Sequence, residues 1–244
     1  AIIGVVGLGY VGLPLSINFA RAGFPVLGFD IDSLHVEQNN RGEQVMRHIP
    51  RKAMQELARN GEATTNFTRL GEADAVLICV PTPLDQHHQP DMSYVETAAD
   101  AIAATLRKGQ LVALESTTWP GTTRELLLPR LEASSLHAGK DFFLVYSPER
   151  EDPGNANYEM SDIPKVVGGH TDTCRDLGVA LYESVVPRAI PVSSPETAEA
   201  TKLMENIFRA VNIAMVNELK LVFDRMGVNI WEVIEAAATK PFGF

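Results

Sequence analysis

Cysteine is scarce in this sequence of 244 residues, which has only Cys79 and Cys174. Two cysteines in a chain of this length form no disulfide framework, which is typical of proteins from a reducing cytoplasm. Cys79 lies in the apolar run AVLICV and is expected to be a small buried side chain. Cys174 lies near the start of a predicted helix and is not expected to act as a nucleophile.

Long apolar runs and basic clusters are also missing. No stretch approaches the roughly 18 consecutive apolar residues of a membrane span. The formal net charge is −10, and the sequence has no run of Lys and Arg. Neither nucleic acid nor an anionic membrane is therefore expected as a main partner. No metal site is expected either.

Short apolar runs alternate with helical patterns through residues 1–193. Strands are expected at 1–7, 25–30, 74–80, 110–116, 142–147, 165–169 and 189–193, and helices at 11–22, 33–41, 51–60, 93–107, 121–133 and 172–185. Continuous apolar strands separated by helices indicate a parallel sheet covered on both faces. The sequence therefore predicts an α/β domain with a doubly wound, Rossmann-like sheet.

The pattern changes at Ser194, Pro195 and Glu196, which together form a good helix start. No Pro or Gly then interrupts the chain until Gly227. A helix of about 32 residues would be roughly 48 Å long, so it is expected to connect two units or to pair with another subunit. A second helix is expected over NIWEVIEAAAT. Residues 194–244 are therefore predicted to begin a separate helical region.

The first candidate functional motif is GLGYVG at residues 7–12, between a strand and a helix. Gly7 permits the tight turn, Gly9 lets a pyrophosphate approach the backbone, and Gly12 lets helix and strand pack closely. The helix N-terminus offers free N–H groups to the phosphates. Asp30 ends the next predicted strand, where a carboxylate accepts hydrogen bonds from the adenosine ribose and repels a 2′-phosphate. The motif therefore predicts NAD rather than NADP as the cofactor.

Three further motifs follow predicted strands, where ligands bind in doubly wound sheets. CVPTPLD at 79–85 is placed to line the cofactor, or forms only a rigid turn. In ESTTWPGTT at 115–123 the hydroxyls either orient a reacting alcohol or water, or cap the helix that follows. YSPEREDPGN at 146–155 carries Glu149, Arg150, Glu151 and Asp152, which offer a general base or form a solvated loop.

Lys202 and Asn206 have i,i+4 spacing on the predicted long helix and so share one face. Together they could bind and polarise an oxygen atom and stabilise developing negative charge. The alternative is an ordinary solvated helix face.

The segments GLGYVGLPL, GFDID, CVPTPL, ESTTWPGTT, SPER-DPGN and KLMEN occur in this order along nearly the whole chain. In sequence and order they resemble the UDP-glucose/GDP-mannose dehydrogenase family of nucleotide-sugar 6-dehydrogenases. The resemblance implies oxidation of a sugar's primary C6 alcohol to a carboxylate in two NAD-dependent steps. RHIP at 47–50, PTPLDQHHQPDMSYV and PERxDPGN are most similar to the UDP-N-acetylhexosamine branch. UDP-N-acetylglucosamine is therefore the expected substrate, with UDP-glucose and UDP-N-acetylmannosamine as alternatives.

The resemblance also implies roles for particular residues. Thr117 would hold a catalytic water beside the nicotinamide, Glu149 would assist proton transfer, and Lys202 with Asn206 would stabilise an oxyanion. The residues implied to contact the cofactor are Gly7, Leu8, Gly9, Tyr10, Val11, Gly12, Asp30, Val80, Pro81, Thr82 and Thr117. No role is assigned to His35, which replaces a basic residue of many relatives, or to Asp152.

Members of this family carry a catalytic Cys in a Gly-rich segment soon after the position of KPFGF, followed by a second domain that binds most of the UDP. The residues given contain neither. The chain is therefore expected to supply the NAD-binding half and the start of a central dimerisation region, in a homodimer formed through the long helix. Two alternatives remain at this point: a dehydrogenase of the 3-hydroxyacid type, and a non-catalytic dinucleotide-binding or dimerisation module.

Overall fold

A computed structural model describes residues 1–150 and 163–241 of the chain. The chain divides into two compact units, Ala1–Lys202 and Leu203–Phe244. Among the described residues, no helix combines the length and the apolar content that crossing a membrane requires.

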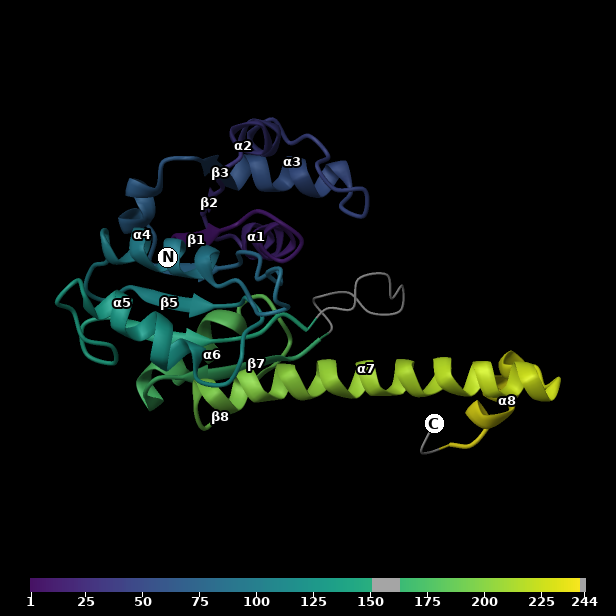
Figure 1. The fold of residues 1–244 in the computed structure, drawn as a ribbon. Helices are drawn as coiled ribbons and strands as arrows, with labels where there is room; N and C mark the ends of the chain where they lie inside the picture. The colour runs from purple at the N-terminus through teal and green to yellow at the C-terminus, as the bar shows by residue number, and fades with distance from the viewer. Residues whose placement is uncertain (151–162, 242–244) are drawn as a thin grey trace. The chain divides into compact units, whose positions relative to one another are not determined.

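The first unit is built on one sheet of eight described strands (Figure 1). The strands are β1 (Ile3–Val6), β2 (Val26–Phe29), β3 (Gly61–Thr64), β4 (Ala75–Ile78), β5 (Leu111–Leu114), β6 (Phe143–Tyr146), β7 (Lys165–Gly169) and β8 (Ala189–Val192). Their order across the sheet is β3-β2-β1-β4-β5-β6-β7-β8, so the chain winds outward from β1 in both directions. This order confirms the predicted doubly wound, Rossmann-like fold.

The expectation that the whole sheet is parallel is wrong at one pair. β7 runs antiparallel to β6, with Val145 opposite Gly169 and Tyr146 opposite Gly168, whereas the other neighbouring strands are parallel. The segment between two antiparallel neighbours starts and ends at the same edge of the sheet. The first residue of β7, Lys165, therefore lies at the edge where β6 ends.

The edge strand β3 was not predicted. Its sequence, GEAT, lacks the apolar run of the interior strands, and only Ala63 of its four residues is buried. An edge strand is covered less completely than a central one, so its side chains carry less of the apolar signal on which the prediction relies.

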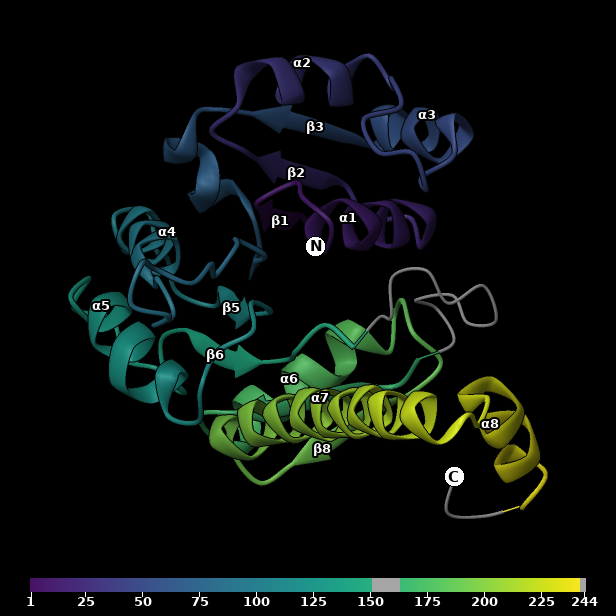
Figure 2. The same ribbon diagram turned by 45° about the vertical axis from the view of Figure 1, so that its right-hand side comes forward.

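Helices cover both faces of the sheet. They are α1 (Gly12–Arg21), α2 (Ser33–Asn40), α3 (Arg51–Asn60), the 3₁₀ segment η1 (Phe67–Glu72), α4 (Ser93–Ala103), the π-helical segment η2 (Thr123–Leu127), α5 (Leu128–Glu132) and α6 (Asp172–Tyr182). The two faces form separate buried clusters, one with side chains of α1, α3 and α6 and the other with side chains of η1, α4 and α5. Figure 2 shows α4 and α5 on the opposite side of the strands from α1 and α3.

Both cysteines are buried within this core, as predicted for Cys79. Burial, followed by the nearby charge of Glu115, raises the pKa of the Cys79 thiol well above its ordinary value. Cys79 is therefore held as a neutral thiol.

The long helix α7 (Pro195–Met226) and α8 (Ile230–Ala238) have nearly the predicted bounds. Gly227, which was predicted to end the long helix, lies between them and has a positive φ of 70°. The second compact unit begins within α7, at Leu203.

Candidate cofactor site

The glycine turn between β1 and α1 has the geometry that its sequence predicts. Gly7 has φ +91°, which side chains rarely adopt, and a Cβ there would lie 2.8 Å from the carbonyl oxygen of Cys79. A Cβ on Gly12 would lie only 1.9 Å from the carbonyl oxygen of Gly7. A Cβ on Gly9 would instead meet no atom within 4 Å, so this backbone faces open space. The turn thus leaves room for a ligand at the position predicted for the pyrophosphate.

The start of α1 is suited to an anion. Its N-cap residue, Val11, makes no side-chain capping hydrogen bond in the described structure, and no acidic residue lies in the first turn. Free N–H groups and the positive end of the helix dipole therefore remain for a negatively charged ligand.

Asp30 lies just beyond β2, beside the glycine turn. Its Oδ2 accepts a hydrogen bond from the Leu8 N–H at 2.9 Å, and its Oδ1 accepts one from the Asp32 N–H at 3.1 Å. The Nδ1 of His35 lies 3.7 Å from Oδ2. The carboxylate therefore holds the glycine turn as well as bordering the open space beside it.

A cavity of about 720 Å³ opens between the glycine turn and α4. Its lining includes five of the predicted cofactor residues: Gly7, Gly9, Asp30, Val80 and Pro81. The prediction missed the rest of the wall, which comprises Val6, Phe29, Ile31, Phe67, Cys79, Ser93, Tyr94, Thr97, Ala98 and Ala101. Most of the missed residues come from α4 and η1, and their contribution depends on how these elements pack across the sheet.

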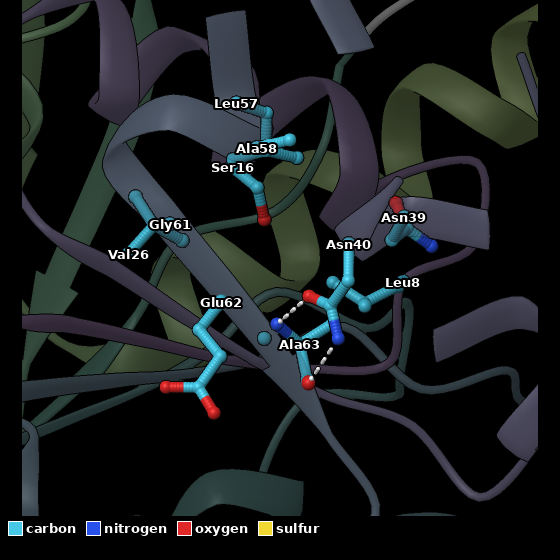
Figure 3. Close-up of a pocket in the computed structure, with 11 residues that line it drawn as sticks. Leu8, Ser16, Val26, Asn39, Asn40, Leu57, Ala58, Gly61, Glu62 and Ala63 are labelled. Carbon is cyan, nitrogen blue, oxygen red and sulfur yellow. Dashed lines mark hydrogen bonds between the residues drawn. The ribbon is translucent and has the colours of Figure 1, made fainter. Parts of the chain in front are cut away.

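A second pocket lies between α2, α3 and β3 and has a volume of only about 10 Å³, the space of a single water molecule (Figure 3). Beside it the Asn40 side chain accepts from the Ala63 N–H at 2.7 Å and donates to the Ala63 carbonyl at 2.9 Å. This pair of bonds fixes α2 to the edge strand, and the pocket is far too small for a dinucleotide.

Two of the predicted motifs meet where β4 and β5 end. The Thr82 hydroxyl donates to the Thr117 carbonyl at 3.0 Å, and the Ser116 hydroxyl donates to the Val80 carbonyl at 2.7 Å. Thr82 and Thr117, both predicted to contact the cofactor, are therefore joined directly. Thr117 is exposed, whereas Ser116 and Thr118 on either side are buried.

Glu149 follows β6 at the same edge of the sheet, and its side chain is 13% exposed. Its Oε1 accepts a hydrogen bond from the Arg150 N–H at 2.7 Å, and its Oε2 lies 3.4 Å from the ammonium group of Lys165. Lys165 was not among the residues predicted from the sequence. Glu151 and Asp152 lie outside the described residues.

Lys202 and Asn206 lie one turn apart on α7, and both are half-buried. The boundary between the two compact units falls between them. Their convergence with the strand-end residues therefore stays a prediction.

Another contact missed from the sequence joins Tyr10 to His48 of the RHIP segment. Their rings are stacked, with an interplanar angle of 9° and centroids 5.8 Å apart. Tyr10 is 71% exposed, so this pair borders the glycine turn on its solvent side.

A tight glycine turn, an uncapped helix start, an acidic residue beyond the second strand and a large adjoining cavity together define a dinucleotide-binding protein. The comparison with protein families is more specific. Residues 1–186 match the NAD binding domain of the UDP-glucose/GDP-mannose dehydrogenase family, and residues 196–244 match the central domain of that family. The chain belongs to the UDP-glucose/GDP-mannose dehydrogenase family, and its cofactor is NAD.

Individual relatives agree with this assignment. The chain is 39% identical over 240 residues to a UDP-N-acetyl-D-glucosamine 6-dehydrogenase of Pseudomonas aeruginosa, covering 98% of this chain and 56% of the relative. It is 40% identical over 246 residues to a UDP-N-acetyl-D-mannosamine dehydrogenase of Yersinia pestis, covering 98% of this chain and 59% of the relative. The solved structure of a UDP-D-ManNAc dehydrogenase from Pyrococcus horikoshii superimposes with a TM-score of 0.92 at 38% identity, covering all of this chain and 59% of that one.

The chain thus spans between half and two thirds of the length of these relatives. The family match excludes the 3-hydroxyacid type that the sequence left open.

Proposed function

We propose that this chain supplies the NAD-binding half of a nucleotide-sugar 6-dehydrogenase. The reaction converts the primary C6 alcohol of a UDP-sugar to a carboxylate, with one water consumed and two molecules of NAD reduced. In this proposal residues 1–193 bind NAD, and residues 194–244 begin the central helical region.

The observation that carries the proposal is the continuous row of groups along one edge of the sheet. The glycine turn and Asp30 border the cavity, and Thr82 joins Thr117 at the ends of the next two strands. Glu149 follows on the neighbouring strand. This row supports the proposal, because ligands bind at this edge of a doubly wound sheet and a carboxylate there could act as an acid–base group.

NAD bound in the cavity would accept the hydride that C6 loses at each oxidation. The protein's own groups hold the reactants and move protons. The exposed Thr117 is proposed to orient a water molecule, and Glu149 to take up the proton released as the alcohol or water reacts. Lys202 and Asn206 are proposed to stabilise negative charge on the reacting oxygen.

For the sugar, UDP-N-acetylglucosamine is the proposed substrate. A 6-dehydrogenase for this sugar is among the most similar relatives, at 39% identity, but a mannosamine dehydrogenase has 40% identity. UDP-N-acetylmannosamine is therefore the nearest alternative, followed by UDP-glucose.

The proposal is tested by supplying the natural gene product with NAD and a panel of these UDP-sugars and following NADH formation. Two NADH per sugar and a uronic acid product are expected with UDP-N-acetylglucosamine. NADH formation with a different UDP-sugar would refute the proposed substrate but support the proposed reaction. NAD binding without NADH formation from any sugar would refute the enzyme and support a non-catalytic dinucleotide-binding module.

A homodimer formed through α7 is also proposed. Large apolar side chains of this helix are exposed in the isolated chain, including Met204 at 74%, Phe208 at 72% and Val211 at 60%. Light scattering of the natural gene product at several concentrations measures the mass directly. The proposed location is the cytoplasm, consistent with two unpaired, buried cysteines.

A further inference from the structure

A lysine is buried beneath the proposed reaction site. The side chain of Lys165 is 5% exposed, and its ammonium group contacts the Glu115 carboxylate, whose side chain is fully buried. The Tyr182 hydroxyl donates a hydrogen bond to the other oxygen of Glu115, and the Lys165 ammonium lies 5.1 Å from the Tyr182 ring centroid. These three side chains come from β7, the end of β5 and α6, so tertiary packing brings them together.

The charge state of this group follows from its contacts. Burial disfavours the Lys165 ammonium, but the negative charges of Glu115 and Glu149 outweigh burial and raise the Lys165 pKa. Burial, together with the charge of Glu115, raises the pKa of Tyr182. Lys165 is therefore a cation and Tyr182 a neutral hydrogen-bond donor throughout the physiological range.

A buried ion pair is weak evidence for a purely stabilising role, because apolar residues of similar size are often as stable or more so. The ammonium of Lys165 also reaches a second carboxylate, since it lies 3.4 Å from Glu149 Oε2 and 3.4 Å from the Pro148 carbonyl oxygen. Unlike Glu115, Glu149 is partly exposed. The Lys165 ammonium thus contacts both the fully buried Glu115 carboxylate and the partly exposed Glu149 carboxylate.

The reversed direction of β7 makes this contact possible. Its register with β6 pairs Tyr146 with Gly168, and continuing that register along both chains brings Lys165 opposite Glu149. Glu149 is then held at both oxygens: Oε1 by the Arg150 N–H and Oε2 by the Lys165 ammonium.

We propose that Lys165, anchored by Glu115 and Tyr182, is a positioning residue that keeps the Glu149 carboxylate charged and in one orientation for proton transfer. The inference rests on the proposed function, in which Glu149 accepts a proton. Among the described residues, the titratable groups that interact with Glu149 include the Lys165 ammonium, the Glu115 carboxylate and the neutral Cys79 thiol. Of these three groups, Lys165 carries the positive charge, which favours the ionised carboxylate of Glu149.

The test compares the natural gene product with a variant that lacks both buried charges, those of Lys165 and Glu115. Lys165→Met alone leaves Glu115 as an unpaired buried carboxylate and could prevent folding. The double variant Lys165→Met/Glu115→Gln removes both members of the buried pair and keeps their approximate volumes. Lys165→Arg preserves the cation, and Lys108→Met is the matched control, because Lys108 is 76% exposed and pairs with Asp141 at the surface.

For the double variant we expect kcat to fall about 10- to 100-fold, because a general base has lost its orientation. The acidic limb of its kcat–pH profile should move upward, because the Lys165 ammonium that lies 3.4 Å from Glu149 Oε2 is lost, and loss of the Glu115 charge offsets part of this movement. NAD affinity should stay unchanged. Lys165→Arg should return the limb toward its wild-type position, and Lys108→Met should leave kcat and the profile as in the wild type.

A folded double variant with wild-type kcat and pH profile would overturn the positioning role while leaving the dehydrogenase reaction intact. If the double variant does not fold, the Lys165→Arg variant provides the test. A folded Lys165→Arg protein that loses as much kcat as Glu149→Gln, although the cation is preserved, would overturn the proposal. A wild-type protein that binds NAD but reduces none with any UDP-sugar would instead overturn the proposed function.

Discussion

Glu199 is a carboxylate with no exposed surface in the first turns of α7, and its removal should destabilise the first unit strongly. Its Oε2 accepts a hydrogen bond from the Gly121 N–H at 2.6 Å. Its Oε1 accepts from the Thr123 N–H at 2.8 Å and from the Thr123 hydroxyl at 2.7 Å. The side chain thus satisfies the N–H groups at the start of the η2–α5 helical segment and ties α7 to the loop that carries Thr117.

Glu199→Ala would leave two backbone N–H groups and one hydroxyl without this acceptor inside the protein. An unsatisfied buried donor costs about 1–3 kcal/mol, and relief from burying the charge offsets part of the sum. We expect a net loss of about 3–5 kcal/mol in the free energy of unfolding. At about 2–4 °C per kcal/mol for a protein of this size, Tm should fall by roughly 10 °C.

Calorimetry or circular dichroism of the variant measures this loss. Glu199→Gln keeps the shape and one acceptor oxygen, so it should lose about half as much. Glu218→Ala is the matched control, because Glu218 lies on the same helix and is exposed; it should change stability by less than about 0.5 kcal/mol. A Glu199→Ala protein as stable as the Glu218→Ala protein would refute the capping role.

Gly12→Ala should cost about 1–3 kcal/mol of stability and weaken NAD binding at least tenfold, because its Cβ would lie 1.9 Å from the Gly7 carbonyl oxygen. Thermal-shift measurements with and without NAD test this, and a variant with wild-type stability and NAD affinity would contradict the close approach of Gly12 to Gly7. Asp30→Ala should weaken NAD binding by about 1–3 kcal/mol in calorimetric titration, and unchanged affinity would remove Asp30 from the site. A hydrogen bond from Arg107 lowers the pKa of Asp74, so their pairing stabilises the fold above about pH 4 and is lost as the pH falls through the lowered pKa. Asp74→Asn should therefore cost at most about 1 kcal/mol at pH 7, since both side chains are partly solvated, and the difference from wild type should vanish once the pH lies below the lowered pKa of Asp74.

The interior of the sheet could be predicted because its strands are apolar on both faces. β1, β2, β4 and β5 are buried along their whole length, so each appears as a continuous apolar run. β3 has no such run and was missed. The expected helix at 93–107 ends at Ala103, where the hydrophobic pattern alone does not mark the last turn.

The candidate site was predictable where chemistry depends on local backbone. The glycine turn needs Gly7 at positive φ and leaves no space for a side chain at Gly12, so these requirements are visible in the residue types themselves. The contribution of α4 to the cavity wall could not be predicted from the sequence. Ser93, Thr97 and Ala101 resemble an ordinary amphipathic helix in sequence, and only packing across the sheet places them beside the glycine turn.

The sequence by itself determined the doubly wound order of alternating strands and helices, the NAD-binding turn and the family, because each depends on residues close together in the chain. Tertiary structure decided the direction of β7. Since β7 runs antiparallel to β6, Lys165 meets Glu149 and Glu115 at the ligand-binding edge, whereas in a parallel strand it would lie at the opposite edge of the sheet. Strand direction depends on the path of the connecting chain and on pairing between distant segments, which the apolar run KVVGG does not encode.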